Sequence, residues 1–393
     1  MDSLNTQFER LRQSPTIAIF DRIAALRAAG RAILPLQVGD PDFGTPPSVL
    51  EAAVKAMEGG LTHYVPSRGL PDLRQAAASK LLRDNGLTYD PAGEILVTHG
   101  GIHAYYLAMQ SILNPGDEAL IPDPTWATHA NMVTMLRGGV VRVPAPAENG
   151  FIPPMEAWEK ALTPRTRAIV LNYPSNPTGA YPSRAYLSQL QAFAAEHDLW
   201  IVSDEVYENL YYADKPTSAG AVPGAKARTI LVHSLSKTYA MTGWRVGYLA
   251  APERVIENAL KASQNSITCV APFVQKAAAF ALTDPGVQES AAGMRAAYAR
   301  RRALVLRLAA EYESEKVRVT PPMGAFYFFL DFRPLGRPSL EICERLLDEA
   351  GVGLVPGSAF GAQGEGFVRM TIAASEAEVE AGFRKVVEWA ERE

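Results

Sequence analysis

Short apolar runs alternate with helix-like segments through the middle of the chain, and this alternation constrains the fold more than any other feature. The runs are rich in Val, Ile and Leu, are bounded by Gly, Pro or Asp, and predict strands at residues 94–98, 118–121, 168–172, 200–203, 229–233 and 246–250. Helical candidates such as 102–113 and 183–197 lie between them, and Ser183 is placed to cap the second. Strands that alternate with helices predict an α/β fold with a mostly parallel sheet covered on both faces.

The C-terminal part of the chain follows a different pattern. A long helix rich in Ala and Arg is predicted over 288–312, followed by aromatic strands at 325–332 and 367–372 and a closing helix at 376–391. This pattern predicts a smaller α+β domain. A chain of 393 residues is also too long for one compact core, which favours two domains.

The N-terminal stretch contains a loop-like segment, 36–47, which we expect to precede the first regular helix. We expect this N-terminal arm to pack with the smaller domain. The predicted organisation is therefore an arm at 1–45, a large domain at 46–285 and a C-terminal small domain at 286–393.

Charge and cysteine content exclude several classes of function. The formal net charge is -4, so nothing favours binding to nucleic acid or to an anionic membrane. Segment 1–14 mixes charges without the apolar centre of a secretory signal, and no apolar run reaches the ~18 residues that span a bilayer. Only two cysteines occur, Cys269 and Cys343, which disfavours a disulfide framework and predicts a reducing, cytoplasmic location.

Segment 234–245, SLSKTYAMTGWR, is the most informative stretch because it follows an apolar strand. Its polar groups are expected at the carboxyl edge of the sheet, where open α/β sheets bind ligands. The amine of Lys237 forms an imine with an aldehyde when it is at least partly deprotonated, and Ser234 and Arg245 are placed to hold a phosphate. Taken alone, a serine–lysine pair in a loop is more often solvated than functional.

The segment resembles the lysine motif of the fold-type I aminotransferases that depend on pyridoxal 5'-phosphate (PLP), in particular the bacterial aspartate and aromatic branch of class I. The resemblance extends over essentially the whole chain, because further segments match in the same order. It implies a large domain with a seven-stranded, mostly parallel sheet between helices, and a smaller α+β domain. It also implies that Lys237 carries PLP as a Schiff base, with Ser234 and Arg245 at the phosphate.

The second matching segment, VSDEVY at 202–207, also ends a strand. The resemblance implies that Asp204 is the buried carboxylate that keeps the pyridine nitrogen of PLP protonated. It also implies that Tyr207 donates a hydrogen bond to the phenolic oxygen of the ring. Without the resemblance, capping a helix or turn is the more common role for an aspartate in this position.

Two turns that contain glycine follow strands, at 172–179 and 99–102. The first, NYPSNPTG, has two X-Pro steps that force a turn, and the resemblance places Asn176 at the same phenolic oxygen and beside the substrate. The second, HGGI, brings the backbone and a helix N-terminus close to a phosphate. Family members often have a hydroxyl or a lysine in place of Ile102, so only main-chain contacts from Gly101 and Ile102 are implied.

Two aromatic residues complete the implied cofactor site. Trp126, in DPTW, corresponds to an aromatic residue that stacks on the pyridine ring, although core packing is an equally common role for a tryptophan. Tyr64, in HYVPSRG, corresponds to a tyrosine that reaches the phosphate of the other subunit. The resemblance therefore implies a homodimer with shared active sites.

The substrate end of the site depends on Arg369, in FVRMT. An arginine inside an apolar strand needs a partner. The resemblance implies that Arg369 binds the α-carboxylate of the substrate through a bidentate pair, and the alternative is a buried structural salt bridge. Gly39, in VGDPD, is implied to line the same pocket with its backbone.

The sequence departs from the family at the distal end of the pocket. One subgroup has a lysine directly after the Gly-Gly turn, where this chain has Ile102, and another uses a partner-subunit arginine in the stretch that matches 261–267. Both cations are missing, so we expect neutral or aromatic donors to compete with aspartate. The apolar surface expected near the pocket comes from Trp126, Phe20, Tyr105 and Phe360. The candidates for a replacement cation are Arg68, Lys261 and His103.

The predicted activity is a ping-pong transamination between an L-amino acid and a 2-oxo acid, in which Lys237 takes the α-proton and returns it. One alternative is another PLP reaction on the same scaffold, such as elimination, cyclisation, decarboxylation or oxidation, because the fold does not fix the reaction. The other is a non-catalytic PLP-binding regulatory module. Such regulators usually carry an added DNA-binding domain, and retention of Lys237 disfavours this alternative. No metal is implied.

Overall fold

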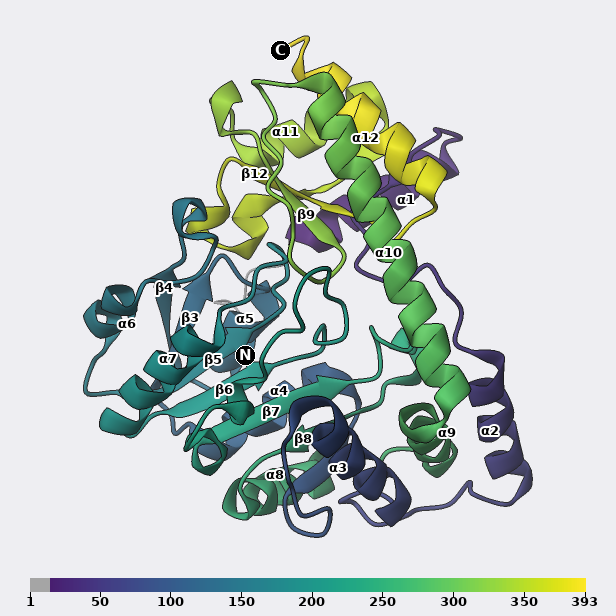
Figure 1. Cartoon of the computed structure of the whole chain (residues 1–393), viewed down its shortest axis with the longest axis vertical. Helices are drawn as coiled ribbons and strands as arrows, with labels where there is room; N and C mark the ends of the chain where they lie inside the picture. Colours follow the sequence, from purple (N-terminus) through teal and green to yellow (C-terminus); the bar gives the residue numbers. More distant parts are fainter. Residues whose placement is uncertain (1–14) are drawn as a thin grey trace, which may run out of the picture.

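The structure is a computed structural model that describes residues 15–393. Figure 1 shows a large twisted sheet covered by helices, with a second group of helices and short strands packed beyond one end of it. The two parts are joined by one long helix, α10 (Pro285–Tyr312), which contacts both α9 (Pro272–Thr283) and α12 (Glu376–Ala390).

The large sheet has seven strands in the order β2-β8-β7-β6-β5-β3-β4. Neighbouring strands from β4 to β7 pair in parallel, and β8 runs antiparallel to both β7 and β2. The prediction of a mostly parallel, seven-stranded sheet is therefore confirmed. The strands are β2 (Ile95–Thr98), β3 (Glu118–Asp123), β4 (Gly139–Pro144), β5 (Thr166–Asn172), β6 (Trp200–Asp204), β7 (Thr229–Ser234) and β8 (Gly247–Ala250).

One of these strands, β4, was missed in the sequence. It forms an edge of the sheet, and most of its residues are only half-buried. Its sequence, GVVRVP, carries an arginine and ends on a proline, so it lacks the continuous apolar run of the buried strands.

Helices cover both faces of the sheet because the strand side chains alternate between two apolar cores. Val170, Val202 and Ile230 belong to the core beneath α4, α5 and α8, whereas Ile169 and Ile201 belong to the core beneath α6 and α7. The helices of this part of the chain are α2 (Pro47–Glu58), α3 (Pro71–Asn85), α4 (Gly100–Ile112), α5 (Ala127–Met135), α6 (Met155–Ala161), α7 (Arg184–Glu196), α8 (Glu253–Ser266) and α9.

The predicted cap of α7 is present. The hydroxyl of Ser183 accepts a hydrogen bond from the backbone N–H of Tyr186 at 3.2 Å. This bond satisfies one of the N–H groups that a helix N-terminus leaves without a partner.

The second sheet is small and antiparallel, in the order β11-β12-β9. Its strands are β9 (Tyr327–Asp331), β11 (Val355–Pro356) and β12 (Phe367–Thr371), and α10, α11 (Ser339–Arg345) and α12 belong to the same region. A separate two-stranded pairing joins β1 (Leu34–Pro35) to β10 (Val352–Gly353). The predicted long helix, aromatic strands and closing helix are all present, with ends shifted by a few residues.

The expectation that the first regular helix follows segment 36–47 is wrong. Helix α1 (Pro15–Ala28) comes earlier in the chain. Its residues Ile19 and Ile23 are buried in the same apolar core as α12 and the small sheet, because their spacing of four places both side chains on one face of the helix.

We propose that the chain consists of an arm at 1–45, a large domain at 46–285 and a small domain at 286–393. The packing of Ile23, Ile33 and Leu36 with the C-terminal core supports the assignment of the arm. Residues 1–14 of the arm lie outside the described part of the chain. Among the described helices, none is long and apolar enough to cross a membrane.

Candidate active site

A cavity of about 430 Å³ lies where the carboxyl ends of the parallel strands meet the small sheet. In the register of the large sheet Asn172, the end of β5, lies beside Asp204, the end of β6, and β7 runs two residues past the partner of Asp204, Val232, to end at Ser234. The carboxyl edge of the sheet is the edge at which open α/β sheets bind ligands. The predicted site residues that line the cavity are Gly39, Gly101, Ile102, Trp126, Asn176, Asp204, Tyr207, Ser234, Lys237, Arg245 and Arg369.

Lys237 follows β7 and reaches into the cavity. Its Nζ donates a hydrogen bond of 2.5 Å to the carbonyl oxygen of Gly39, which belongs to the N-terminal arm. Burial lowers the pKa of Lys237 to about 8, and the nearby carboxylate of Asp40 opposes this shift. A substantial fraction of the amine is therefore uncharged in mildly alkaline solution, as nucleophilic attack on an aldehyde requires.

One end of the cavity is built to receive an anion. Helix α4 begins at Gly100, and its first turn lines the cavity together with Ser234 and Arg245, so the free backbone N–H groups of a helix N-terminus are available there. A Cβ atom at Gly100 would lie 2.9 Å from Nη2 of Arg245, and one at Gly101 would lie 3.1 Å from Cγ1 of Val206. A side chain at Gly101 would crowd Val206, and the φ of +77° at Gly100 is a conformation that favours glycine.

Two hydroxyl groups face the same end. The hydroxyl of Ser234 donates to that of Ser236 at 2.8 Å, and the backbone N–H of Ser236 donates back to the Ser234 hydroxyl at 3.1 Å. Arg245, whose φ of 52° is left-handed, is fixed by a hydrogen bond of 2.8 Å from Nη1 to the carbonyl oxygen of Thr242. Ser236 and Thr242 also line the cavity, and neither was singled out in the sequence.

Asp204 ends β6 and is paired with a histidine that the sequence analysis missed. Nε2 of His129 lies 3.0 Å from Oδ2 of Asp204, and the backbone N–H of Val206 donates to Oδ1 at 3.3 Å. His129 is fully buried on α5, and Trp126, three residues earlier, meets its ring edge-on at 5.2 Å. The carboxylate therefore has a fixed direction before any ligand binds.

Tyr207 is joined to a second tyrosine from the small sheet. The hydroxyl oxygens of Tyr207 and Tyr327 lie 2.9 Å apart, and both residues line the cavity. Burial raises the pKa of Tyr207 well above its ordinary value, so the phenol stays protonated and able to donate. A Cβ atom at Gly39 would lie 2.6 Å from the Tyr327 hydroxyl, which explains the glycine at that position.

Arg369 lies on β12, and its guanidinium group is buried at the other end of the cavity. Nη1 donates to Oδ1 of Asn176 at 2.9 Å, and Nη2 donates to the carbonyl oxygen of Gln37 at 2.7 Å. Nε has no hydrogen-bond partner, and within residues 15–393 no carboxylate pairs with this arginine. The alternative of a structural salt bridge is therefore not supported in the described part of the chain.

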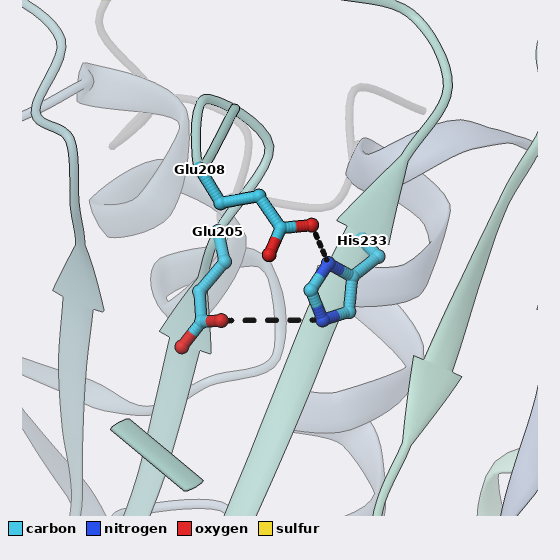
Figure 2. A group of neighbouring side chains, drawn as sticks. All are labelled: Glu205, Glu208 and His233. Atoms are coloured by element: carbon cyan, nitrogen blue, oxygen red, sulfur yellow. Dashed lines mark ion pairs between the residues drawn. The ribbon is translucent and has the colours of Figure 1, made fainter. Parts of the chain in front are cut away.

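A buried polar group lies next to two of the strand ends, formed by Glu205, Glu208 and His233. Figure 2 shows His233 between Glu205 and Glu208, with one ring nitrogen toward each carboxylate. Glu208 also accepts hydrogen bonds from Lys80 and, at 3.0 Å, from Asn85. Because Lys80 already supplies a cation and the carboxylates face opposite nitrogens, we interpret this group as a hydrogen-bonded anchor.

The anchor fixes the two strand ends that carry site residues. Glu205 follows Asp204, and its Oε1 accepts from the hydroxyls of Ser203 and Ser218 at 3.0 Å each and from the N–H of Ala219 at 2.9 Å. His233 precedes Ser234. Since successive strand residues point to opposite faces, the anchor holds the backbone from behind while Asp204 and Ser234 face the cavity.

Tyr64 is the predicted site residue that does not line the cavity. It is 86% exposed. Tyr105 was expected near the pocket but lies fully buried beneath His129, to whose carbonyl oxygen it donates a hydrogen bond of 3.1 Å. Phe20 and Phe360 line the cavity as expected.

The candidates for a distal cation do not line the cavity either. Arg68 forms an ion pair with Glu257, and neither Lys261 nor His103 is among the lining residues of the described chain. The cations of the described chain that do line it are Lys237, Arg245 and Arg369.

Comparison with known families agrees with this geometry. Residues 31–386 match the family described as aminotransferase class I and II. The chain belongs to this family. The expectation of an aminotransferase with the corresponding α/β fold is thereby confirmed, and the chain is an enzyme of the transaminase class.

Individual relatives of this aminotransferase are similar over almost their entire length. An aspartate aminotransferase from Pyrococcus abyssi is 40% identical over 372 residues, which is 94% of each chain. An aromatic-amino-acid aminotransferase from Thermococcus litoralis is also 40% identical over 372 residues and 94% of each chain. The solved structure of Thermus thermophilus aspartate aminotransferase with maleate superimposes with a TM-score of 0.93 at 38% identity, covering 99% of this chain and 100% of that one.

Proposed function

We propose that this aminotransferase uses pyridoxal phosphate, held by Lys237, to move an amino group between an L-amino acid and a 2-oxo acid in a ping-pong cycle. The observation that carries the proposal is the convergence of two cations with different tasks on one cavity. Lys237 brings an amine whose pKa is lowered to about 8, and Arg369 brings a buried guanidinium group that no carboxylate within residues 15–393 neutralises.

The residues around the cavity fit this cofactor. The start of α4, Ser234 and Arg245 would hold its phosphate, because backbone N–H groups, hydroxyls and a guanidinium group are all donors to an anion. Asp204 would face the pyridine nitrogen. The donors for the phenolic oxygen would be Asn176 and Tyr207, and Trp126 would cover the ring.

When bound, pyridoxal phosphate supplies an aldehyde that forms an imine with an amine and a ring that accepts the electron pair left after loss of the α-proton. Nζ of Lys237 is the group placed to take that proton from the α-carbon of the substrate and to return it to the carbon that was the aldehyde carbon of the cofactor. Asp204, held by His129, would place its carboxylate beside the ring nitrogen, where the bound cofactor needs positive charge.

Arg369 is the proposed carboxylate-binding residue. Its contacts with Asn176 and Gln37 fix the plane of the guanidinium group, and its Nε remains without a partner. A buried positive charge is costly unless it is paired, so an anionic substrate group at this point is favoured. We expect the enzyme to require an α-carboxylate in its substrates.

We also propose that the active enzyme is a homodimer in a reducing, cytoplasmic environment. Helix α2 exposes an apolar stripe, with Leu50 48%, Val54 47% and Met57 40% exposed, close in sequence to the exposed Tyr64. A contiguous apolar face of this kind is typical of a surface that another subunit covers. Both Cys269 and Cys343 are free thiols, in agreement with a reducing location.

The dimer is tested by subunit exchange. Tyr64→Ala and Lys237→Ala homodimers are each expected to be nearly inactive when PLP is kept too low to fill the weakened phosphate site. Mixing them should restore activity, because a hybrid then has one site with both Lys237 and the partner's Tyr64. With equal mixing, half of the dimers are hybrids and each has one intact site, so about a quarter of wild-type activity is expected.

The matched control places both substitutions on one chain. Hybrids of that double variant with the wild-type protein contain no intact site if Tyr64 acts on the neighbouring subunit, so activity should fall as the double variant is added. If exchange is verified by mass and the first mixture stays inactive, Tyr64 does not serve the other subunit.

The reaction type is tested in a half-reaction. The purified enzyme loaded with PLP and mixed with an L-amino acid, without any acceptor, is expected to release one equivalent of the 2-oxo acid per site and then stop. Transamination stops because the amino group stays on the enzyme. Continued turnover without an acceptor, or release of carbon dioxide, would identify an elimination or a decarboxylation instead.

The same assay ranks the amino donors. The cavity is also lined by Phe20, Ile102, Trp126 and Phe360, and apart from Lys237, Arg245 and Arg369 no cation of the described chain lines it. Neutral, aromatic or medium-sized donors should therefore match or exceed aspartate in kcat/KM, with preferences of roughly 1–3 kcal/mol per altered contact. Comparing aspartate, glutamate, phenylalanine, tyrosine, leucine and alanine decides the point, and a preference for aspartate above about a hundredfold would contradict it.

A further inference from the structure

Three hydrogen bonds join the end of β3 to a turn of the C-terminal part of the chain. The carboxylate of Asp123, the last residue of β3, accepts from the backbone N–H of Ala362 at 3.0 Å and from that of Gln363 at 3.1 Å. Two residues further on, the N–H of Thr125 donates to the carbonyl oxygen of Phe360 at 3.0 Å. We call these three bonds the Asp123 clasp.

The clasp is a close-packed, buried contact. Asp123 is 5% exposed, and a Cβ atom at Gly361 would lie only 1.9 Å from its Oδ1. Gly361 has a φ of 137°, a conformation that side-chain-bearing residues rarely adopt. The turn is therefore shaped so that both carboxylate oxygens of Asp123 reach a backbone donor.

The charge of Asp123 is not neutralised by an ion pair in direct contact within the described chain. Burial raises the pKa of its carboxyl group, while the neighbouring Arg142 on β4 and the two backbone donors oppose the shift. The two N–H groups are thus the main direct partners of a buried carboxylate, and hydrogen bonds of this charge-assisted kind are stronger than neutral ones.

The clasp fixes one wall of the cavity. Phe360, held by its carbonyl oxygen, is 3% exposed, and its ring centroid lies 5.1 Å from the guanidinium carbon of Arg369. Trp126, three residues after Asp123, lines the same cavity. A displacement of the turn would move Phe360 away from the end of the cavity where the α-carboxylate is expected.

We propose that Asp123 is a positioning residue that holds Phe360 against Arg369 and thereby sets the affinity of the enzyme for the α-carboxylate of its substrates. Asp123 does not touch the cavity, so it acts only through the clasp. The inference rests on the proposed role of Arg369.

The first test is Asp123→Asn in the PLP-loaded enzyme. The side-chain NH2 group of the asparagine would face the backbone N–H of either Ala362 or Gln363. Because both groups are donors, at least one hydrogen bond of the clasp is lost. We expect KM and the Kd of an unreactive α-methyl amino acid to rise about tenfold, the order of one charge-assisted hydrogen bond. The value of kcat and the affinity for PLP should stay within about threefold of wild type, because the groups at the lysine end are unchanged.

The second test asks whether the effect passes through Phe360. In a Phe360→Ala background, adding Asp123→Asn should raise the Kd of the α-methyl amino acid by less than about twofold, because the ring that the clasp holds is gone. If the two substitutions multiply fully, Asp123 does not act through Phe360 and the proposal is overturned.

A second variant covers the case in which Asp123→Asn fails to fold. Ala362→Pro removes one donor of the clasp at the first position of a short helical turn, where proline is accepted, and Gly361 before it has an extended ψ of 176°. It should raise the same Kd in the same direction. An unchanged Kd in a folded, PLP-binding Ala362→Pro enzyme would count against the clasp.

Two further variants separate the possible failures. Glu148→Gln breaks another contact between the same two parts of the chain, the ion pair of Glu148 with Arg333 at 2.8 Å, and should leave the Kd unchanged. Arg369→Gln should abolish measurable binding. If Arg369→Gln binds normally, the proposed role of Arg369 is wrong; if it loses binding while Asp123→Asn and Ala362→Pro do not, only the clasp is wrong.

Discussion

Replacing Lys237 with alanine is expected to abolish the visible absorption of the lysine-bound cofactor and to lower kcat by at least about 10⁴-fold. The side chain has two tasks in the proposed function, as the attachment point of PLP and as the base that moves the α-proton. Its amine is the group whose pKa burial lowers to about 8, beside the cavity that Asp204 and Arg369 also line. No other lysine of the described chain lines that cavity.

The measurement is a spectrum of the PLP-loaded protein together with steady-state and single-turnover rates. Lys276→Ala is the matched control, because Lys276 forms an exposed ion pair with Asp72 away from the site and should leave the spectrum and the rate unchanged. A Lys237→Ala enzyme that keeps the absorption band and turns over normally would show that another residue carries the cofactor.

The pH dependence follows from the same pKa. A lysine whose pKa is lowered becomes uncharged at lower pH, so uptake of PLP by the cofactor-free enzyme should speed up as pH rises through about 8. An unperturbed lysine would show the same rise only near its ordinary pKa of about 10.4. Stopped-flow measurement of the absorption change between neutral and alkaline pH distinguishes the two midpoints.

The second large effect is expected for Asp204→Ala. PLP should still attach to Lys237, but the rate of α-proton removal in a single turnover should fall about 10³-fold, because a buried charge aimed at the reacting system is usually a large catalytic term. His129 would lose the hydrogen-bond partner of its Nε2, and it cannot replace the negative charge of the missing carboxylate.

Asp204→Asn makes the comparison sharper. It keeps the shape and one acceptor of the side chain while removing the charge, so it should lose nearly as much rate as Asp204→Ala. If the asparagine variant removes the α-proton at the wild-type rate, hydrogen bonding at this position suffices and the proposed electrostatic role of Asp204 is wrong.

The fold was largely predictable because its determinants are local. Buried parallel strands such as β5 and β7 contain continuous apolar runs. The start of α7 is marked by its N-cap residue, Ser183. Strand β4 was not predicted, because it lies at the edge of the sheet and is only half-buried, so its sequence does not need a continuous apolar run. Helix α1 was not predicted because its buried apolar residues, such as Ile19 and Ile23, pack against the C-terminal core, which is distant in sequence.

The candidate site was predictable to the extent that its residues follow strands in recognisable segments. His129 and Tyr327 were not, because one lies inside a helix and the other inside a strand of the second sheet, and only the fold brings them to Asp204 and Tyr207. Asp123 was not singled out either, because its partners lie 239 and 240 residues away. The lowered pKa of Lys237 and the unpaired Nε of Arg369 likewise depend on burial, which has no sequence pattern of its own.

The anchor of Glu205, Glu208 and His233 has a consequence for protein engineering. The ends of β6 and β7 each present one side chain to the cavity and an adjacent one to the rear, so we expect changes at the rear positions to adjust the geometry of the front. We expect a library of variants restricted to Glu205, Glu208 and His233 to change the catalytic rate while leaving the substrate selectivity unchanged. Substitutions of residues that line the cavity are expected to change the catalytic rate and the selectivity together. The positions behind the cavity are therefore where variants with a changed rate and unchanged selectivity should be sought.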